Sequence, residues 1–580
     1  MTVNLNLAKQ ITQEALKFEK QNNIKKAIES YKKVLDVYIE ECIDDKAFKL
    51  QIKIGDLYQI TGKIESGLSY FLMAYESAKS LENKFFQIDS LAKISDSYLS
   101  IGKIEEGIKY ADKAEDILSC VEYTKGRLEM SIFWARTYYV KKQFYKARDI
   151  CNEALKLCND DYPFLKGRIL VTLAELYKDI TSVEEHLSLL NQAYDYFEKV
   201  DYKRGMLGVI NNIAAVYGDK LQDYETALSY FFKLKGISEN SIFVEFHKIS
   251  YLNIGEAYFK YFKYTDAVFW FTEALKNPAG AYMDNILVYN YSYLLLASLK
   301  LYNYQEAYYY FIKAKDEVGK NANVESTLIQ YYKSAAQLFL EFGENDKSEE
   351  FIKQALNYVS KDETMIKWNI GLIYEYIKLK KASTESEIID IVEGIKYTVS
   401  KYINKDEILD SVYDTAIELI CIKKYELAFK LINEYNHIKS DNDCLLLKEK
   451  YIISKMNEFN SSENLEMLYS ALELAKLTGN SMIYSYICCS IGDYFDKNNK
   501  LADAINYYYK AYCIVKKLIF SVPEEYRIGY INSNNSLDII NKFIFLKKKS
   551  NEMNDSNFFE LKSVYSLKQL EEIFKISDSI

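Results

Sequence analysis

The chain has 580 residues, of which 49% are hydrophobic and 27% charged, and its formal net charge is −9. This composition is typical of a folded protein and excludes a disordered chain. The acidic balance argues against nucleic acid as a direct ligand, because phosphate binding draws its affinity from clustered Lys and Arg. No run approaches the roughly 20 apolar residues of a membrane span, and residues 1–20 contain no apolar core of an export signal. We therefore expect a cytoplasmic protein with no membrane partner.

From the N-terminus onward, small residues recur about every forty positions, and most are followed three residues later by an aromatic residue. Successive anchors from Ala15 to Gly255 are 40, 40, 40, 39, 40 and 41 residues apart. A fixed period of this size predicts stacked helix pairs. The anchors are Ala15, Gly55, Ser95, Ala135, Ala174, Ala214, Gly255, Ala336, Ala416 and Gly492.

Two further small residues follow many anchors, twelve and nineteen positions later, as at Gly67 and Ala74 or Ala267 and Ala274. Small residues at these positions let neighbouring helices approach closely, while the aromatic residue fills the groove between them. Short turns such as Thr61-Gly62-Lys63 separate the two helices of a pair. The three prolines and twenty glycines of the chain leave long helices uninterrupted.

Gly55, Tyr58, Gly67, Phe71 and Ala74 carry the small/aromatic/small signature of tetratricopeptide repeats, so residues 5–518 resemble an array of that family. The period of about 40 exceeds the usual 34, and long-period arrays are similar to Rap-type and clostridial signalling proteins and to kinesin light chains. The resemblance implies an all-α protein, an α-solenoid that forms a right-handed superhelix of about 12 to 13 helix pairs.

The repeat pattern falters after Tyr374, and the next anchor, Ala416, comes 45 residues later than Gly371. We therefore expect an N-terminal array over 1–375, a shorter C-terminal array over 376–518 and a helical segment over 519–580. We expect a helix to begin at Pro523, because proline is favourable in the first turn of a helix. Glu524 and Glu525 would then lie near the positive end of the helix dipole. This last segment is interpreted as a cap on the final repeat, with a junction to a signalling output as the alternative.

In tetratricopeptide grooves, the sixth position of the first helix faces the concave side, and Asn212, Asn253 and Asn369 occupy it here. An amide offers both a donor and an acceptor, so it can pair with the backbone of an extended peptide whatever that peptide's sequence. The resemblance implies that these residues clamp a peptide. Other predicted groove residues are Asn211, Arg136, Glu175, Glu256, Tyr293 and Lys333, with Lys53 and Lys93 in earlier repeats.

Signature motifs of nucleotide-binding, hydrolytic and kinase folds are absent from the sequence. Nine cysteines form no CxxC pair, and with three histidines they offer no zinc-site spacing. We therefore expect no cofactor, no metal and no enzymatic activity. The sequence favours a cytoplasmic scaffold that binds a protein or peptide, in bacterial signalling. The alternative is the sensory half of a signalling system that acts through its C-terminal segment on a separate output enzyme or transcription factor. Partner identity and oligomeric state stay open.

Overall fold

The computed structural model describes residues 2–21, 23–178, 181–239, 243–276, 283–321, 324–359, 364–402, 404–456, 462–550 and 562–579. Within these ranges every regular element is a helix. Helices α1 to α26, taken in twos along the chain, make thirteen pairs, which confirms the expected number and the all-α solenoid class. Among the described helices, none combines the length and the apolar character needed to cross a lipid bilayer.

The contacts divide the chain into two compact units, residues 1–257 with 277–281 and residues 258–276 with 282–580. This division differs from the one expected from the repeat pattern, whose boundary at 375 lies inside the second unit. The first unit contains α1 (Thr2–Lys20), α2 (Ile24–Glu40), α3 (Asp44–Ile60), α4 (Ile64–Ser80), α5 (Lys84–Ser100), α6 (Ile104–Leu118), α7 (Thr124–Val140), α8 (Phe144–Leu157), α9 (Pro163–Tyr177), α10 (Val183–Lys199), α11 (Lys203–Ala215), the π-helix Val216–Leu221, α12 (Tyr224–Ser238) and most of α13 (Val244–Lys260).

The second unit begins with the end of α13 and contains all later helices. Its array consists of α14 (Tyr264–Lys276), α15 (Met283–Lys300), α16 (Tyr304–Asn321), α17 (Glu325–Glu341), α18 (Asn345–Leu356), α19 (Thr364–Lys381), α20 (Glu385–Val399), α21 (Lys405–Cys421), α22 (Tyr425–Tyr435), α23 (Asp443–Met456), α24 (Ser462–Thr478), α25 (Ser481–Lys497) and α26 (Leu501–Ser521). A 3-10 turn (Glu524–Tyr526) and α27 (Arg527–Ser533), α28 (Ser536–Ser550) and α29 (Leu567–Ser579) follow.

The anchor Gly55 acts as the sequence predicts in the contact between α3 and α4. A Cβ atom at Gly55 would lie 2.4 Å from the Phe71 ring, and that ring is fully buried. Only glycine therefore allows the two helices to approach this closely. The turn that joins them uses Gly62 with φ of +75°, a left-handed conformation that glycine adopts without steric cost.

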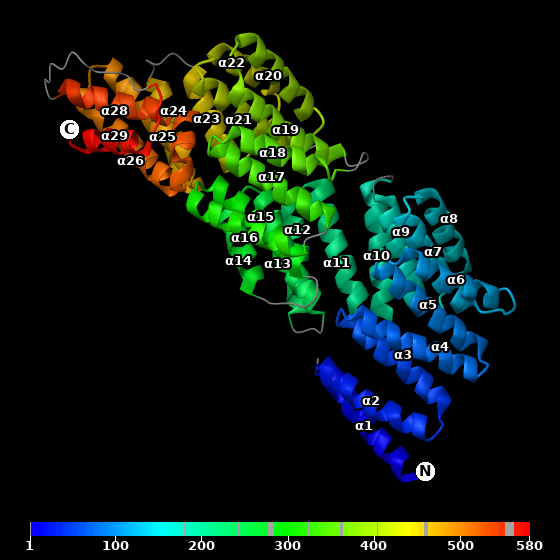
Figure 1. Ribbon diagram of the computed structural model, residues 1–580. Helices are drawn as coiled ribbons and strands as arrows, with labels where there is room; N and C mark the ends of the chain where they lie inside the picture. The colour runs from blue at the N-terminus through cyan, green and yellow to red at the C-terminus, as the bar shows by residue number, and fades with distance from the viewer. Residues whose placement is uncertain are drawn as a thin grey trace. The chain divides into compact units, whose positions relative to one another are not determined.

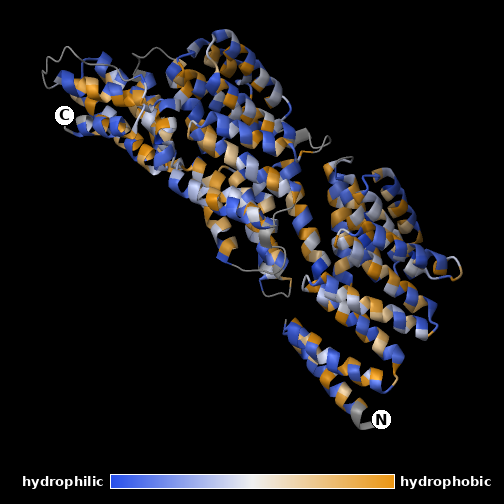
Figure 2. Ribbon diagram, viewed as in Figure 1, coloured by the Kyte–Doolittle hydropathy of each residue, from blue (hydrophilic) through white to orange (hydrophobic). Residues whose placement is uncertain are grey.

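Within the first unit, successive helices from α1 to α12 pack on one another, and first helices also contact first helices, as α5 does α7, α7 does α9 and α9 does α11. Successive helices run side by side in this order (Figure 1). Apolar and polar residues are mixed along the helices (Figure 2). Every helix of the unit contributes buried apolar side chains. The buried side chains form several separate clusters along the unit.

The second unit is built differently, because residues far apart in the sequence are in contact. Tyr526 stacks on Phe342 with ring centroids 5.5 Å apart, and the Tyr530 hydroxyl donates to the Tyr304 hydroxyl across 3.3 Å. A Cβ atom at Gly529 would lie 2.6 Å from the Phe342 carbonyl oxygen. We call residues 523–533 the return segment. It brings the chain back onto α16 to α18, about 180 to 230 residues earlier.

Charged residues also join distant repeats of the second unit. Asp410 on α21 lies 3.5 Å from the Lys300 ammonium on α15 and 2.5 Å from that of Lys448 on α23. Burial favours a higher pKa for Asp410, but the two ammonium groups outweigh it and lower the pKa to about 2. Most of the buried apolar side chains of this unit form one large cluster from Val288 to Phe574, and a smaller separate cluster includes Ile352, Ile370 and Ile373.

The C-terminal helices cover the last repeat, as expected for a cap. Helix α28 packs on α26, and Leu537, Ile540 and Phe543 are buried in the large cluster. Tyr512 of α26 stacks on Phe543 with centroids 4.7 Å apart. The final pair of the solenoid therefore does not leave its apolar face exposed to water, which a repeat array requires of its ends.

Candidate functional site

In the first unit, the odd-numbered helices from α1 to α13 are the first helices of their pairs. Polar contacts join each of these helices to the next one. Near the N-terminus, the Lys53 ammonium lies 2.9 Å from Glu19 and the Lys93 ammonium 2.8 Å from Asp56. These pairs link α1 to α3 and α3 to α5. We call the surface formed by these odd-numbered helices the first-helix face.

In the middle of this face, two arginines link three successive repeats. Arg136 on α7 pairs with Asp96 on α5, and Arg168 on α9 lies 2.8 Å from Glu129 and 3.9 Å from Asp96. Burial alone would raise the pKa of Asp96, but Arg136, Arg168 and Lys93 together lower it below its ordinary value. Asp96 is thus held ionised by cations from two neighbouring repeats.

Further along, amides replace the charged pairs. The Asn212 side chain on α11 donates to Glu175 on α9 at 3.2 Å, and the Asn253 side chain on α13 donates to Asn211 at 2.7 Å. Each contact uses one hydrogen-bonding position of an amide that has several. The four residues therefore form a polar strip across α9, α11 and α13.

A π-helix lies directly after this strip. The sequence has one residue more than usual between Ala214 and the next turn, and the structure accommodates it in the π-helix Val216–Leu221. Gln222 then takes a left-handed conformation with φ of 56°, and Asp223 caps α12 by accepting from the Thr226 N–H. The insertion changes the turn and leaves the α-helical part of α11, which carries Asn211 and Asn212, undisturbed.

An apolar pocket of about 250 Å³ opens among α3, α5 and α7. The Phe48 and Phe86 rings stack at its floor, with centroids 4.1 Å apart and an interplanar angle of 9°. Five charged side chains surround the apolar residues Phe48, Ile52, Phe86 and Ala92, and they are Lys49, Asp89, Lys93, Lys125 and Glu129. Four of these side chains belong to inter-repeat ion pairs: Lys93 pairs with Asp56, Glu129 with Arg168, and Asp89 and Lys125 with each other at 2.8 Å.

Seven of the predicted groove residues lie in the inter-repeat contacts of the first-helix face, and they are Lys53, Lys93, Arg136, Glu175, Asn211, Asn212 and Asn253. Glu256 is on the same helix as Asn253, and it is half-buried. The other three belong to the second unit. Tyr293 is buried between the rings of Phe259 and Phe271, while Lys333 and Asn369 are half-buried on α17 and α19.

Sequence reasoning missed the pocket residues Phe48 and Phe86 and the charged residues Asp96, Glu129 and Arg168. A usable signal for the charges was present, because opposite charges such as Asp56 and Lys93 recur 37 residues apart, close to the repeat period. No such signal marks the aromatic pair, since its members are ordinary apolar residues of two first helices.

The helix pairs, their close-packed small anchors and the contacts between successive first helices decide the architecture. The chain has the fold of a helical-repeat solenoid, in which its helix pairs and small anchors resemble those of tetratricopeptide arrays. No protein-family model matches the sequence, and no curated protein matches it.

Solved structures that resemble the array include the apo form of RapI, with 18% identity over 47% of this chain and 97% of that one, at a TM-score of 0.37. A Rap protein complexed with Competence and Sporulation Factor matches at 14% identity over 70% of this chain and 99% of that one, with a TM-score of 0.38. The apo quorum sensor NprR from B. thuringiensis matches at 14% identity over 62% and 99%, with a TM-score of 0.46.

The first-helix face has two features that could contact a peptide, the polar strip and the apolar pocket, and both lie in the first unit. The amide strip on α9 to α13 can exchange its mutual hydrogen bonds for bonds to a peptide backbone, because donors and acceptors are both present. The pocket among α3, α5 and α7 has the size and apolar floor to take a large side chain.

Proposed function

We propose that this array is a non-enzymatic cytoplasmic scaffold of bacterial signalling, and that its first-helix face binds an extended protein or peptide segment. The observation that carries the proposal is the polar strip of Glu175, Asn211, Asn212 and Asn253. A peptide backbone that binds here would replace the hydrogen bonds between these side chains with bonds of comparable strength to itself. The exchange of one set of hydrogen bonds for the other therefore costs little free energy. Ion pairs such as Arg168 with Glu129 hold the neighbouring helices in register for this exchange.

The first-helix face is favoured over the C-terminal segment as the partner site. Tyr526 and Tyr530 of the return segment are buried against residues of α16 to α18. A partner that used this segment would first have to displace those aromatic contacts. The four side chains of the polar strip, by contrast, are half-buried. A partner that binds them does not have to displace buried aromatic side chains.

The test begins with recovery of a partner segment from native cytoplasm by a pull-down with the full chain. The double variant Asn212→Ala, Asn253→Ala is then titrated with that segment. Each lost amide leaves a peptide group without its bond, which costs about 1–3 kcal/mol, so we expect affinity to fall by roughly one to three orders of magnitude. Helicity should be kept, because alanine is the better helix former.

The matched control is Asn191→Ala. Asn191 is exposed on α10, a second helix, and its amide donates within its own helix to the Leu187 carbonyl at 2.9 Å. We expect this variant to bind the segment as the unaltered chain does. Unchanged affinity in a folded double variant would move the partner off the first-helix face.

A further inference from the structure

The apolar pocket among α3, α5 and α7 lies on the same face of the array as the polar strip. Its lining residues Ala92 and Lys93 lie three and two positions before the anchor of their repeat. Asn211 and Asn212 of the polar strip lie at the same two positions of a later repeat. Equivalent positions of stacked repeats face the same way along a solenoid. One extended segment can therefore reach the pocket and the strip together.

The pocket owes part of its volume to the small side chain of Ala92. The preceding and following repeats have Ile52 and Ile132 at the same position, forty residues away on either side. Ile132 is buried, as expected of a large apolar residue in a packed array. Alanine in the middle repeat leaves about 250 Å³ of space beside the stacked rings of Phe48 and Phe86. The repeat pattern is thus interrupted at the position where the pocket opens.

The charged side chains that surround the pocket already have partners. Each of the five has an ion-pair partner 2.8 Å away, and the pairs are Lys49 with Asp45, Lys93 with Asp56, Lys125 with Asp89, and Glu129 with Arg168. A charged side chain that entered the pocket would have to compete with one of these pairs. A neutral, apolar side chain leaves all of them in place. The charges of the pocket therefore favour an apolar occupant.

The lining favours an aromatic ring over an aliphatic side chain of similar size. Phe48 and Phe86 present aromatic carbon to the pocket, and aromatic pairs gain attraction beyond the area that they bury. The ammonium groups of Lys93 and Lys125 also line the pocket, and that of Lys93 already lies 6.0 Å from the centre of the Phe71 ring. A ring beside these ammonium groups gains cation–π attraction that an aliphatic side chain does not.

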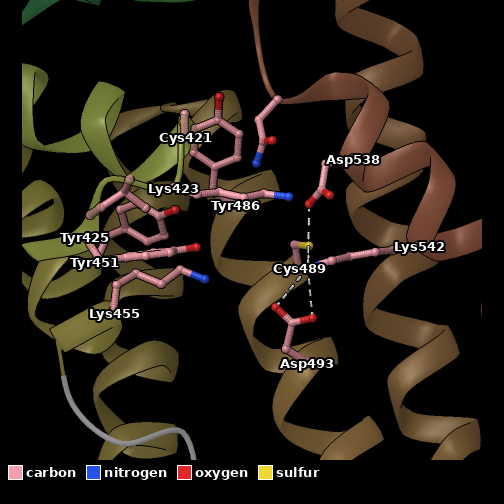
Figure 3. A pocket seen from close by; sticks show the side chains of 12 residues that line it. Cys421, Lys423, Tyr425, Tyr451, Lys455, Tyr486, Cys489, Asp493, Asp538 and Lys542 are labelled. Carbon is pink, nitrogen blue, oxygen red and sulfur yellow. Dashed lines mark hydrogen bonds and ion pairs between the residues drawn. The ribbon is translucent and has the colours of Figure 1, made fainter. Parts of the chain in front are cut away.

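A smaller cavity in the last repeats of the second unit does not share these properties. It has a volume of about 80 Å³, less than a third of that among α3, α5 and α7, and charged and hydroxyl-bearing side chains line it (Figure 3). The Lys542 ammonium lies 3.0 and 3.2 Å from the Asp493 oxygens and 3.6 Å from Asp538. These ion pairs form one wall, so this cavity is the poorer match for an aromatic ring.

We propose that the pocket among α3, α5 and α7 binds an aromatic side chain of the partner segment and so selects which segments bind. This inference rests on the proposed function and adds the residue that the segment must carry. The first helices α5, α7, α9 and α11 contact one another in turn, and packed helices lie about 8–10 Å apart, which separates the pocket from the strip by about 24–30 Å. An extended chain advances about 3.3 Å per residue, so the aromatic residue lies about seven to nine residues from the backbone at the strip.

The first test uses the full chain with isoleucine methyl labelling and N-acetyl-phenylalaninamide as the probe. A ring that enters the pocket should shift the NMR signal of the Ile52 methyl group through its ring current, and the shift should saturate. Ala92→Ile gives this repeat the residue of its neighbours and fills the space, so it should weaken probe binding about 10-fold or more. The matched control is Val171→Ile, at the same repeat position of α9 and outside the pocket, which should leave probe binding unchanged.

N-acetyl-cyclohexylalaninamide, which carries an aliphatic ring of similar size, separates aromatic recognition from simple apolar burial. The aromatic probe should bind about 2- to 10-fold more tightly. Phe86→Leu keeps the pocket apolar and should reduce this preference, and it serves as the second variant if Ala92→Ile does not fold. Equal or tighter binding of the aliphatic probe to the unaltered chain would overturn the proposal. An Ile52 shift that is absent, or that persists undiminished in folded Ala92→Ile, would do the same.

The pocket and the strip are tested separately, because Asn212→Ala, Asn253→Ala should bind the probe as the unaltered chain does. Ala92→Ile should lower the affinity for the recovered partner segment by about 10- to 100-fold. Alanine in place of the segment's aromatic residue should cost as much, with little further loss in Ala92→Ile. If Ala92→Ile lowers this affinity and the strip variant does not, the pocket stands and the clamp fails. Full affinity of folded Ala92→Ile for the segment would overturn the role of the pocket.

Discussion

The close approach of α3 and α4 gives a sharp prediction from two glycines at the same repeat position. Gly55 and Gly371 are both anchors in the middle of a first helix, and each precedes a tyrosine by three residues. A Cβ atom at Gly55 would lie 2.4 Å from the fully buried Phe71 ring, whereas no described atom lies within 4 Å of one at Gly371. Gly55→Ala therefore adds a methyl group where the space is already filled, and Gly371→Ala adds one where the space is open.

The magnitudes follow from two opposing effects. Replacing glycine by alanine inside a helix stabilises it by about 0.8–1 kcal/mol, and this gain applies to both variants. At Gly55 the added methyl overpacks the contact with Phe71, which costs about 1–3 kcal/mol. Gly371→Ala should therefore stabilise α19 by about 1 kcal/mol, while Gly55→Ala should be neutral or destabilise α3 and α4 by up to about 2 kcal/mol.

Native-state hydrogen exchange is the appropriate assay, because a repeat array opens locally and a global unfolding curve would average the effect. Amides of α3 and α4 in Gly55→Ala should exchange no more slowly than in the unaltered chain, and amides of α19 in Gly371→Ala should exchange more slowly. Adding Phe71→Leu to Gly55→Ala should relieve part of the clash. Equal protection gains in the two single variants would refute the packing described for Gly55.

Two other outcomes are expected. Ala267→Leu inserts bulk at a fully buried position of α14 and should lower stability by about 1–3 kcal/mol, whereas unchanged thermal unfolding would contradict the close packing there. The pKa of Asp96 is lowered in the folded state from its ordinary value of 3.8. The stability that ionised Asp96 contributes is therefore fully present at a pH above this ordinary pKa, and it is lost as the pH falls through the lowered pKa of the folded state. Asp96→Asn should therefore reduce stability at neutral pH and flatten its acid dependence in thermal melts.

The repeat pattern was enough to predict the helix pairs and their close contacts. The spacing of Gly55, Gly67 and Ala74 reflects packing between helices that are neighbours in the sequence, so a local pattern carries that information. The cap was expected because a repeat array must cover its last apolar face, and Leu537, Ile540 and Phe543 of α28 provide that cover. These features depend on contacts with the adjacent repeat alone.

The features that were not predicted depend on which side chains meet across repeats. The amides Asn212 and Asn253 were chosen as groove residues, yet the sequence did not indicate that Glu175 and Asn211 accept their hydrogen bonds. The stacked pair of Phe48 and Phe86 carries no mark that separates it from ordinary core residues. Each of these contacts is fixed by the angle between successive helices, which the repeat period does not determine.

The return segment could not be anticipated for a different reason. Tyr526 contacts Phe342, and Tyr530 contacts Tyr304, at separations of about 180 to 230 residues. No periodic signal extends over such a distance. In a solenoid whose units contact their neighbours alone, this contact would not exist.

That contact gives the two units different folding behaviour. In the first unit the buried clusters are separate, so a terminal repeat can fray or be removed while the rest stays folded. In the second unit the return segment and the shared cluster from Val288 to Phe574 tie the last sixty residues to helices made long before them. During synthesis, α16 to α18 must therefore wait, incompletely covered, for residues 523–533 to leave the ribosome, and the second unit folds as a single late cooperative step.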